Sequence, residues 1–189
     1  MNETQRCPWC GDDPLYVAYH DEEWGRPEHD DRKLFEMLIL EGAQAGLSWI
    51  TILRKREGYR AAFHGFHPKK VAAMTDDDVE RLMQNPAIVR NRLKIHSAIR
   101  NAKVFLQMQR EHGSFSDWLW AHVDGKPILR IRGDARVPAS TELSDRVSKS
   151  LKKAGMNFVG STVIYAYLQA CGVVNDHLPG CFLHPHGEA

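Results

Sequence analysis

The spacing of apolar residues is the feature that most constrains how this chain folds. Apolar side chains recur every three or four positions almost throughout, as in Leu34, Leu38 and Ile39, and no stretch alternates apolar and polar residues between turn signals. The sequence therefore predicts an all-α fold. With 43% hydrophobic residues, 189 residues suffice for one core, so we expect a single globular domain over residues 1–189.

Local signals predict where the first helices begin and end. Asp30 and Asp31 are candidate N-caps of a helix that ends near Gly46, and Ser48 precedes the next helix. Pro68 is suited to the first turn of a short helix, because its fixed φ fits the helix and its missing N–H leaves no bond unmade there.

A helix, a turn and a second helix are predicted near residues 79–106. Thr75 and Asp78 form a capping-box pattern before the first helix, which ends near Asn85 and Pro86, and Ile95 begins the apolar stripe of the second. Later in the chain we expect an irregular connection and two more helices, over residues 125–139, 141–155 and 161–171.

Charge gives no global sign of a nucleic-acid partner, since 25 basic residues almost balance 24 acidic ones. A local cluster is present in the predicted turn, where Arg90, Arg92 and Lys94 surround Asn91. Backbone N–H groups at a helix start and nearby cations bind phosphate, so this turn is a candidate DNA contact. A solvated basic face is the alternative.

No apolar run long enough for a signal peptide or a membrane span is found in the sequence. We therefore expect a cytoplasmic protein with no membrane association. In that compartment the four cysteines are more suited to be reduced thiols or metal ligands than disulfides.

Candidate metal ligands gather near the two ends of the chain. Five side chains are candidates for a four-ligand site, and a closed thiolate and imidazole shell would make that site structural; the candidates are Cys7, Cys10, His20, His177 and Cys181. Isolated packed or surface side chains are the alternative. His184 and His186 lie in a polar tail and are left outside the site.

Glu41 is a candidate buried acid. It follows Leu34 by seven residues and Leu38 by three, which places its carboxylate on their apolar helix face. A buried carboxylate without a partner costs several kcal/mol or shifts its pKa, so its presence suggests a hydrogen-bond network or a cationic ligand. An exposed glutamate at the helix end is the alternative.

Aromatic residues are concentrated around that acid in the sequence. A box of aromatic faces beside a carboxylate would suit a positively charged nucleobase, although ordinary core packing explains any single one of them. The aromatic residues are Trp9, Tyr16, Tyr19, Trp24 and Trp49.

Four strings, quoted in chain order, carry a resemblance to a known family. They are DPLYVAYHDEEWG, KLFEMLILEGAQAGLSWITILRKRE, NFVGSTVIYAYLQACGVVNDH and HLPGC. Together they resemble the 3-methyladenine DNA glycosylases of type I over nearly the whole chain. The resemblance implies a helix-hairpin-helix glycosylase fold. It also implies a zinc-stapled terminal subdomain from about residues 1–25 and 156–185.

The resemblance also assigns roles to residues. It implies one structural zinc ion on Cys7, His20, His177 and Cys181, with no organic cofactor, and leaves Cys10 as a departure from the pattern. It places Glu41, Trp9, Tyr16, Tyr19 and Trp49 in a base pocket, with Trp24 as a further candidate. It places Gln44, Gly46 and Leu47 where the protein probes the gap that a flipped base leaves in the DNA. Leu93 stands where a glycine would ease the hairpin turn, so Arg90, Arg92 and Lys94 are expected to carry more of the phosphate contact.

The implied activity is excision of 3-methyladenine from double-stranded DNA by a monomer. Methylation at N3 makes the base a good leaving group, so Glu41 need only bind its edge while water attacks the sugar C1′, giving free base and an abasic site. The matched strings place no lysine for a Schiff base, so we expect no strand cleavage. The alternatives are a noncatalytic, zinc-stabilised binder of damaged DNA and a metallohydrolase with an open zinc position.

Overall fold

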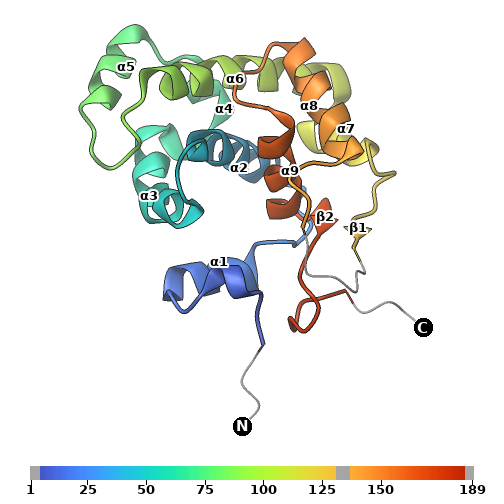
Figure 1. The fold of residues 1–189 in the computed structure, drawn as a ribbon. Coiled ribbons are helices and arrows are strands. Elements are labelled where there is room, and N and C mark those ends of the chain that lie inside the picture. Colours follow the sequence, from blue (N-terminus) through green and yellow to red (C-terminus); the bar gives the residue numbers. More distant parts are fainter. Residues whose placement is uncertain (1–4, 131–136, 186–189) are drawn as a thin grey trace.

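The computed structural model describes residues 5–130 and 137–185, which form a mostly helical protein with almost no strand (Figure 1). The all-α prediction is confirmed. The elements before the hairpin turn are η1 (Pro8–Cys10), α1 (Pro14–Glu22), α2 (Asp31–Gln44), α3 (Trp49–Ala62), η2 (His64–Phe66), α4 (Pro68–Ala72) and α5 (Asp76–Met83). The elements after it are α6 (Arg92–His112), α7 (Phe115–Ala121), β1 (Ile128–Leu129), α8 (Glu142–Ala154), α9 (Ser161–Ala170) and β2 (Val174–Asn175).

Helix α2 lies at the centre of the fold and contacts α3, α6, α7 and α9 (Figure 1). Two neighbouring aspartates fix its N-terminus, one to the helix itself and the other to α7. The Asp30 side chain accepts from the backbone N–H of Lys33, and Asp31 accepts from the backbone N–H groups of Phe115 and Ser116 at the start of α7. This double anchoring sets the direction of the helix that carries Glu41.

The predicted caps and helix ends agree closely with the structure. Ser48 precedes α3, Pro68 opens α4, Thr75 and Asp78 form the capping box of α5, and Gly155 ends α8 at a φ of +108°. Helix α2 ends at Gln44, two residues before the predicted position. A helix, a turn and a helix are present at α5 and α6, and the assignment of this unit to the helix-hairpin-helix superfamily stays a prediction.

Residues 125–139 are not irregular throughout. Ile128 and Leu129 pair in parallel with Val174 and Asn175, forming a two-stranded ladder next to the end of α9. Residues 131–136 of this segment lie outside the described residues. The ladder holds the start of this connection against the segment that follows α9.

The described N-terminal and C-terminal segments meet on one side of the molecule. Figure 1 shows α1 and the segment that follows β2 on the same side, away from α5 and α6. The backbone N–H of Phe182 donates to the carbonyl oxygen of Gln5, and that of Gly25 donates to the carbonyl oxygen of Gln169. None of the described helices is long and apolar enough to cross a membrane.

Candidate functional site

Helix α2 buries the carboxylate of Glu41. The side chains of Leu34 and Leu38 pack in the core on the same face, and Glu41 is only 4% exposed. Its Oε2 atom has no hydrogen-bond partner within the described part of the chain. Burial raises the pKa of Glu41 to about 8, because the charged form loses the hydration it has in water.

A cavity of about 250 Å³ opens over this acid. Its walls come from the N-terminal segment, α1, α2, α3, α9 and the chain after residue 136. The lining residues are Trp9, Tyr16, Tyr19, Trp24, Glu41, Gln44, Trp49, Val137, Ala166 and Gln169. The cavity thus combines Glu41 with all five aromatic residues that the sequence analysis singled out, and with Gln44.

The aromatic rings form a connected wall around the cavity. Trp9 contacts Tyr16 and Trp24 with ring centroids 5.2 and 4.9 Å apart, and Tyr19 contacts Trp49 at 5.5 Å. The Nε1 donor of Trp49 is buried and forms no hydrogen bond to any described residue. A flat cation that offers N–H donors fits this arrangement, because the ring faces and the carboxylate all attract positive charge.

Gln169 is a cavity residue that sequence reasoning missed. Its Nε2 donates to Asp176 Oδ2 at 2.8 Å, and the same carboxylate forms an ion pair with Arg130 at 3.0 Å and accepts from Tyr165. The carboxylate fixes the amide orientation, because it only accepts. Val137 and Ala166 were also missed. Ala166 lies on α9 and Val137 in the connection before α8, and apolar spacing alone does not reveal that these two segments reach the cavity.

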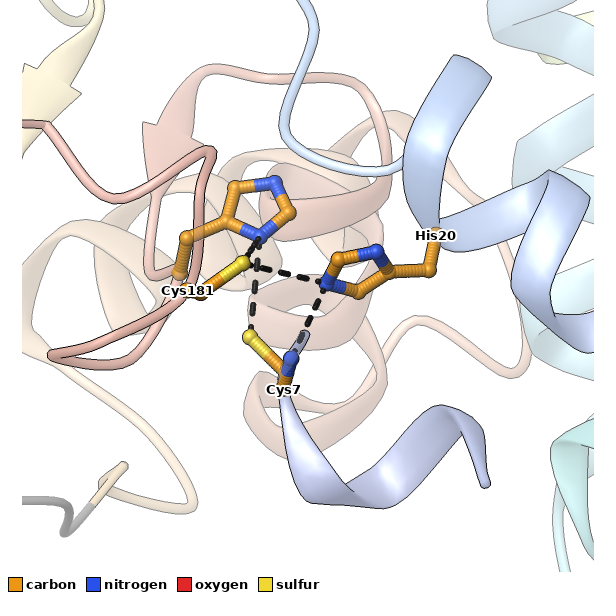
Figure 2. Close-up of side chains that lie close together, drawn as sticks. Cys7, His20 and Cys181 are labelled. Carbon is orange, nitrogen blue, oxygen red and sulfur yellow. Dashed lines mark hydrogen bonds between the residues drawn. The ribbon is translucent and has the colours of Figure 1, made fainter. Parts of the chain in front are cut away.

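The four predicted metal ligands lie in one buried cluster. Figure 2 shows Cys7, His20 and Cys181 converging from the N-terminal segment, α1 and the C-terminal loop. Cys181 Sγ lies 3.4 Å from His20 Nε2 and 3.5 Å from His177 Nδ1, and Cys7 Sγ lies 3.6 Å from His177 Nδ1. All four donor atoms are within 4.8 Å of one another.

These distances fit a tetrahedral metal ion. Zinc bonds of about 2.3 Å to sulfur and about 2.0 Å to nitrogen place neighbouring ligand atoms about 3.6 Å apart. The donor set of two thiols and two imidazoles is also the one that zinc prefers. A buried Cys₂His₂ group that could hold a metal ion is therefore present, and no fifth described Cys, His, Asp or Glu belongs to it.

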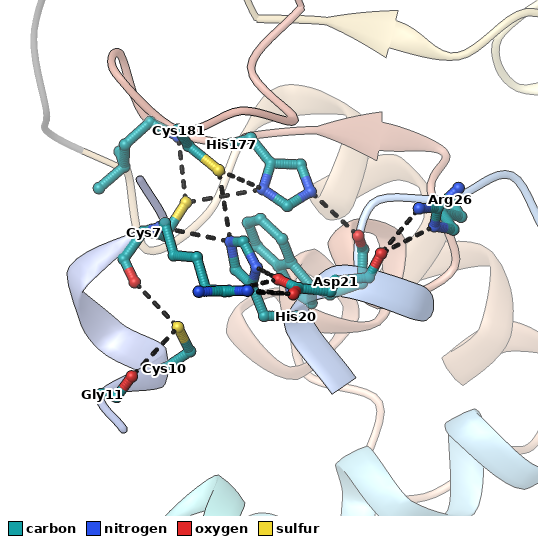
Figure 3. A network of polar contacts seen from close by, with 11 residues as sticks. Cys7, Cys10, Gly11, His20, Asp21, Arg26, His177 and Cys181 are labelled. Carbon is teal, nitrogen blue, oxygen red and sulfur yellow. Dashed lines mark hydrogen bonds and ion pairs between the residues drawn. The ribbon is translucent and has the colours of Figure 1, made fainter. Parts of the chain in front are cut away.

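Hydrogen bonds outside the cluster orient both imidazoles (Figure 3). His20 Nδ1 lies 2.7 Å from Asp21, which forms an ion pair with Arg6, and His177 Nε2 lies 3.1 Å from the carbonyl oxygen of Trp24. In each ring the outer nitrogen therefore donates to that oxygen, and the inner nitrogen faces the cluster as a possible metal ligand. His20 Nε2 also accepts from the backbone N–H of Cys7 at 3.3 Å. The backbone N–H of Leu178 donates to Cys7 Sγ, as amides commonly do to a metal-bound thiolate.

Cys10 is not a member of the cluster. Its Sγ donates to the carbonyl oxygen of Cys7 at 3.2 Å and lies outside the group of four donor atoms (Figure 3). The structure thus selects the same four of the five candidates as the resemblance does. All four cysteines are free, as expected from the sequence.

The predicted DNA-facing residues occupy two neighbouring segments. Gln44 ends α2, and the following loop contains Gly46, at a φ of +79°, and Leu47, which is 39% exposed. Of the hairpin cations, Arg90 is exposed, Arg92 forms an ion pair with Glu80, and the Lys94 ammonium donates to backbone carbonyls of the first segment. Leu93 is 70% exposed at the start of α6.

The family model described as methyladenine glycosylase matches residues 9–184. This chain is a member of the methyladenine glycosylase family. The match includes Trp9, Glu41, Trp49 and three of the four cluster residues, while Cys7 precedes it. The family predicted from the sequence strings is confirmed.

Relatives within the methyladenine glycosylase family cover nearly the whole chain. DNA-3-methyladenine glycosylase 1 of Escherichia coli strain K12 is 54% identical over 96% of this chain and 97% of its own length. DNA-3-methyladenine glycosylase of Haemophilus influenzae is 51% identical over 94% and 97%.

Solved structures of methyladenine glycosylases share the fold. A crystal structure of 3-methyladenine DNA glycosylase I superposes with a TM-score of 0.93, at 56% identity, over 96% of this chain and 100% of that chain. The 3-methyladenine DNA glycosylase I of Staphylococcus aureus, whose structure concerns 3-methyladenine recognition, gives a TM-score of 0.91 at 38% identity over 98% and 99%. The fold prediction is thereby confirmed at the level of the family.

Proposed function

We propose that this protein is a DNA glycosylase that removes 3-methyladenine from alkylated double-stranded DNA. The observation that carries the proposal is the buried, unpartnered carboxylate of Glu41 inside an aromatic cavity sized for one base. Relatives of about 50% identity are named DNA-3-methyladenine glycosylases, and family membership supports the same activity here.

The cavity explains how a cationic base would be held. The lesion leaves the duplex, its faces pack against the rings of Trp9, Tyr16, Tyr19, Trp24 and Trp49, and its N–H edge meets Glu41. Because the free carboxyl has a pKa of about 8, the bound cation favours the ionised form that the empty cavity disfavours. Binding and ionisation are therefore coupled.

The proposed reaction is hydrolysis. The bond between the base and the sugar C1′ breaks, its electron pair leaves with the base, and 3-methyladenine departs uncharged. Water adds to C1′ and loses a proton, which leaves an abasic site. The positive charge on the substrate makes the base a good leaving group, so no strong general acid is required. No lysine is found among the described residues that line the cavity, which supports a monofunctional enzyme without a lyase step.

We also propose that the Cys₂His₂ cluster of Cys7, His20, His177 and Cys181 holds one structural zinc ion. Burial raises the pKa of Cys7 to about 12 and lowers that of His177 to about 4, so without a cation both side chains favour neutral forms. A bound zinc ion would stabilise the thiolates and close a four-ligand shell, leaving no position for a catalytic water. The cluster would then shape the cavity without taking part in the reaction.

Duplex DNA would approach along the loop after α2. Gln44, Gly46 and Leu47 would fill the space left by the flipped base, and Arg90 and Arg92 would face the phosphates. The ion pair with Glu80 engages Arg92 in the free protein, so Arg90 is the cation most ready for phosphate. A monomer would suffice, because the described cavity is built from one chain.

Release of bases from methylated DNA tests the proposal. The chain is incubated with duplex DNA treated with a methylating agent, and the supernatant is separated by chromatography. Free 3-methyladenine is the expected product. Mainly 7-methylguanine would contradict the proposed specificity, and retention of the DNA without any released base would indicate a noncatalytic binder.

A further inference from the structure

Lys94 makes contacts that differ from those expected of a phosphate ligand. Its Nζ donates to the carbonyl oxygens of Ala43 at 2.8 Å and Ala45 at 2.6 Å, across about fifty residues of sequence. Two of the three N–H donors are therefore used inside the protein. The side chain is partly buried, and this burial lowers the pKa of Lys94.

The two acceptors lie at the C-terminus of α2. The last carbonyls of a helix have no partner within the helix and carry the negative end of its dipole, so a lysine ammonium is well matched to them. Ala43 belongs to the last turn, and at Ala45 the chain leaves the helix with a ψ of 117°. Lys94 thus fastens the point at which α2 turns into the loop that leads to Trp49.

That last turn also carries the chemistry of the cavity. Glu41 lies two residues before Ala43, and Gln44 lies between the two carbonyl acceptors, so a shift of this turn would move both cavity residues. Lys94 itself is fixed at the start of α6, where its backbone N–H donates to the N-cap side chain of Asn91. Hydrogen bonds of Lys94 therefore connect the hairpin to the turn of α2 that carries the cavity residues.

We propose that Lys94 is a positioning residue, which holds the Glu41 turn of α2 in place through its two carbonyl hydrogen bonds. The proposal rests on the proposed function. It separates Lys94 from Arg90, which is exposed and forms no hydrogen bond or ion pair within residues 5–130 and 137–185. The sequence analysis predicted both cations to be phosphate ligands. The contacts of Lys94 favour a role inside the protein, in positioning the last turn of α2.

Binding of free 3-methyladenine distinguishes the two roles, because the free base has no phosphate. Lys94→Met removes the ammonium and keeps the length of the side chain. A positioning role predicts weaker binding of the free base and a single-turnover excision rate about 10- to 100-fold lower, since small misplacements of reacting groups have effects of this size. A phosphate role predicts unchanged binding of the free base. It also predicts a smaller salt slope, which is the slope of the logarithm of the DNA binding constant against the logarithm of the salt concentration, by about 1.

Two further variants control the experiment. Lys103→Met removes an exposed cation of the same helix that faces neither carbonyl, and it should leave base binding and excision unchanged. Arg90→Met should lower the salt slope by about 1. Thermal unfolding and zinc content are measured alongside, and a Lys94→Met protein with wild-type base binding and excision rate would overturn the proposal.

A second substitution at Lys94 covers the case in which Lys94→Met does not fold. Lys94→Arg keeps the charge but replaces a compact ammonium by a planar guanidinium. If Lys94 is a phosphate ligand, Lys94→Arg should bind the free base as the wild type does, and this result would overturn the proposal. If Lys94 is a positioning residue, Lys94→Arg should bind the free base more weakly, and the salt dependence of its DNA affinity should be unchanged. If the wild type binds free base but excises nothing, the proposed function fails and the base-binding comparison still tests Lys94.

Discussion

At the scale of single residues, Glu41 shows how a functional group opposes stability. Its carboxylate lies in the core without a hydrogen-bond partner for Oε2 within the described chain, and burial raises its pKa from 4.5 to about 8. In the unfolded chain the same carboxyl ionises near 4.5. The folded state therefore holds a proton that the unfolded state releases throughout that pH range, and stability falls as the pH rises from about 4.5 to about 8.

Replacing Glu41 by Gln should remove this dependence. We expect Glu41→Gln to be more stable than the wild type by about 3 to 5 kcal/mol at pH 8.5, since each pKa unit corresponds to about 1.4 kcal/mol, and to show little difference near pH 4.5. Excision of 3-methyladenine should fall. Urea unfolding at the two pH values and single-turnover excision measure these effects. An equal stability difference at both pH values would argue against a buried, ionisable Glu41.

The same scale shows what residue patterns reveal and what they miss. Glu41 was predicted because its position relative to Leu34 and Leu38 follows from helical geometry alone. Gln169 was not, because its amide is fixed by Asp176, which in turn pairs with Arg130, and the folded chain brings these two residues together from the positions that follow β2 and β1. Local periodicity carries no information about such contacts.

At the scale of elements, helix ends were predicted better than short elements. The caps at Asp30 and Thr75 were predictable because side-chain acceptors act on N–H groups two or three residues away. Helix α1 lacks an apolar stripe, because its buried residues, Tyr19 and His20, serve the cavity and the metal cluster. The seven residues of α7 and the two of each strand are too few for a period to recur.

The loop between α2 and α3 leads to a prediction about DNA. If this loop fills the gap left by a flipped base, Leu47→Ala should lower excision from duplex DNA by about tenfold, because less apolar surface replaces the lost stacking. Binding of free 3-methyladenine should stay at the wild-type level, since Leu47 is not among the residues that line the cavity. Single-turnover excision and titration with the free base are the measurements. Wild-type excision by Leu47→Ala would exclude a gap-filling role.

At the scale of the whole molecule, the Cys₂His₂ cluster connects the ends of the chain. Cys7 and His20 lie in the N-terminal segment and α1, and His177 and Cys181 lie in the loop after β2. The same N-terminal segment supplies Trp9 and much of the aromatic wall of the cavity. The cluster therefore links the stability of the terminal segments to the shape of the cavity, and the terminal subdomain of residues 1–25 and 156–185 stays a prediction that this linkage supports.

Replacing one ligand tests that linkage against a matched cysteine. Cys181→Ala should lose bound zinc and lower the free energy of unfolding by several kcal/mol, because an incomplete shell holds the ion weakly and the terminal segments are no longer tied. Cys10→Ala removes an equally buried thiol outside the cluster and should keep wild-type zinc content. Metal analysis, thermal unfolding and titration with free 3-methyladenine are compared for both. Base binding should weaken only in Cys181→Ala, since Trp9 and Tyr16 then lose their support. A Cys181→Ala protein with wild-type zinc content and stability would show that the cluster is not the metal site.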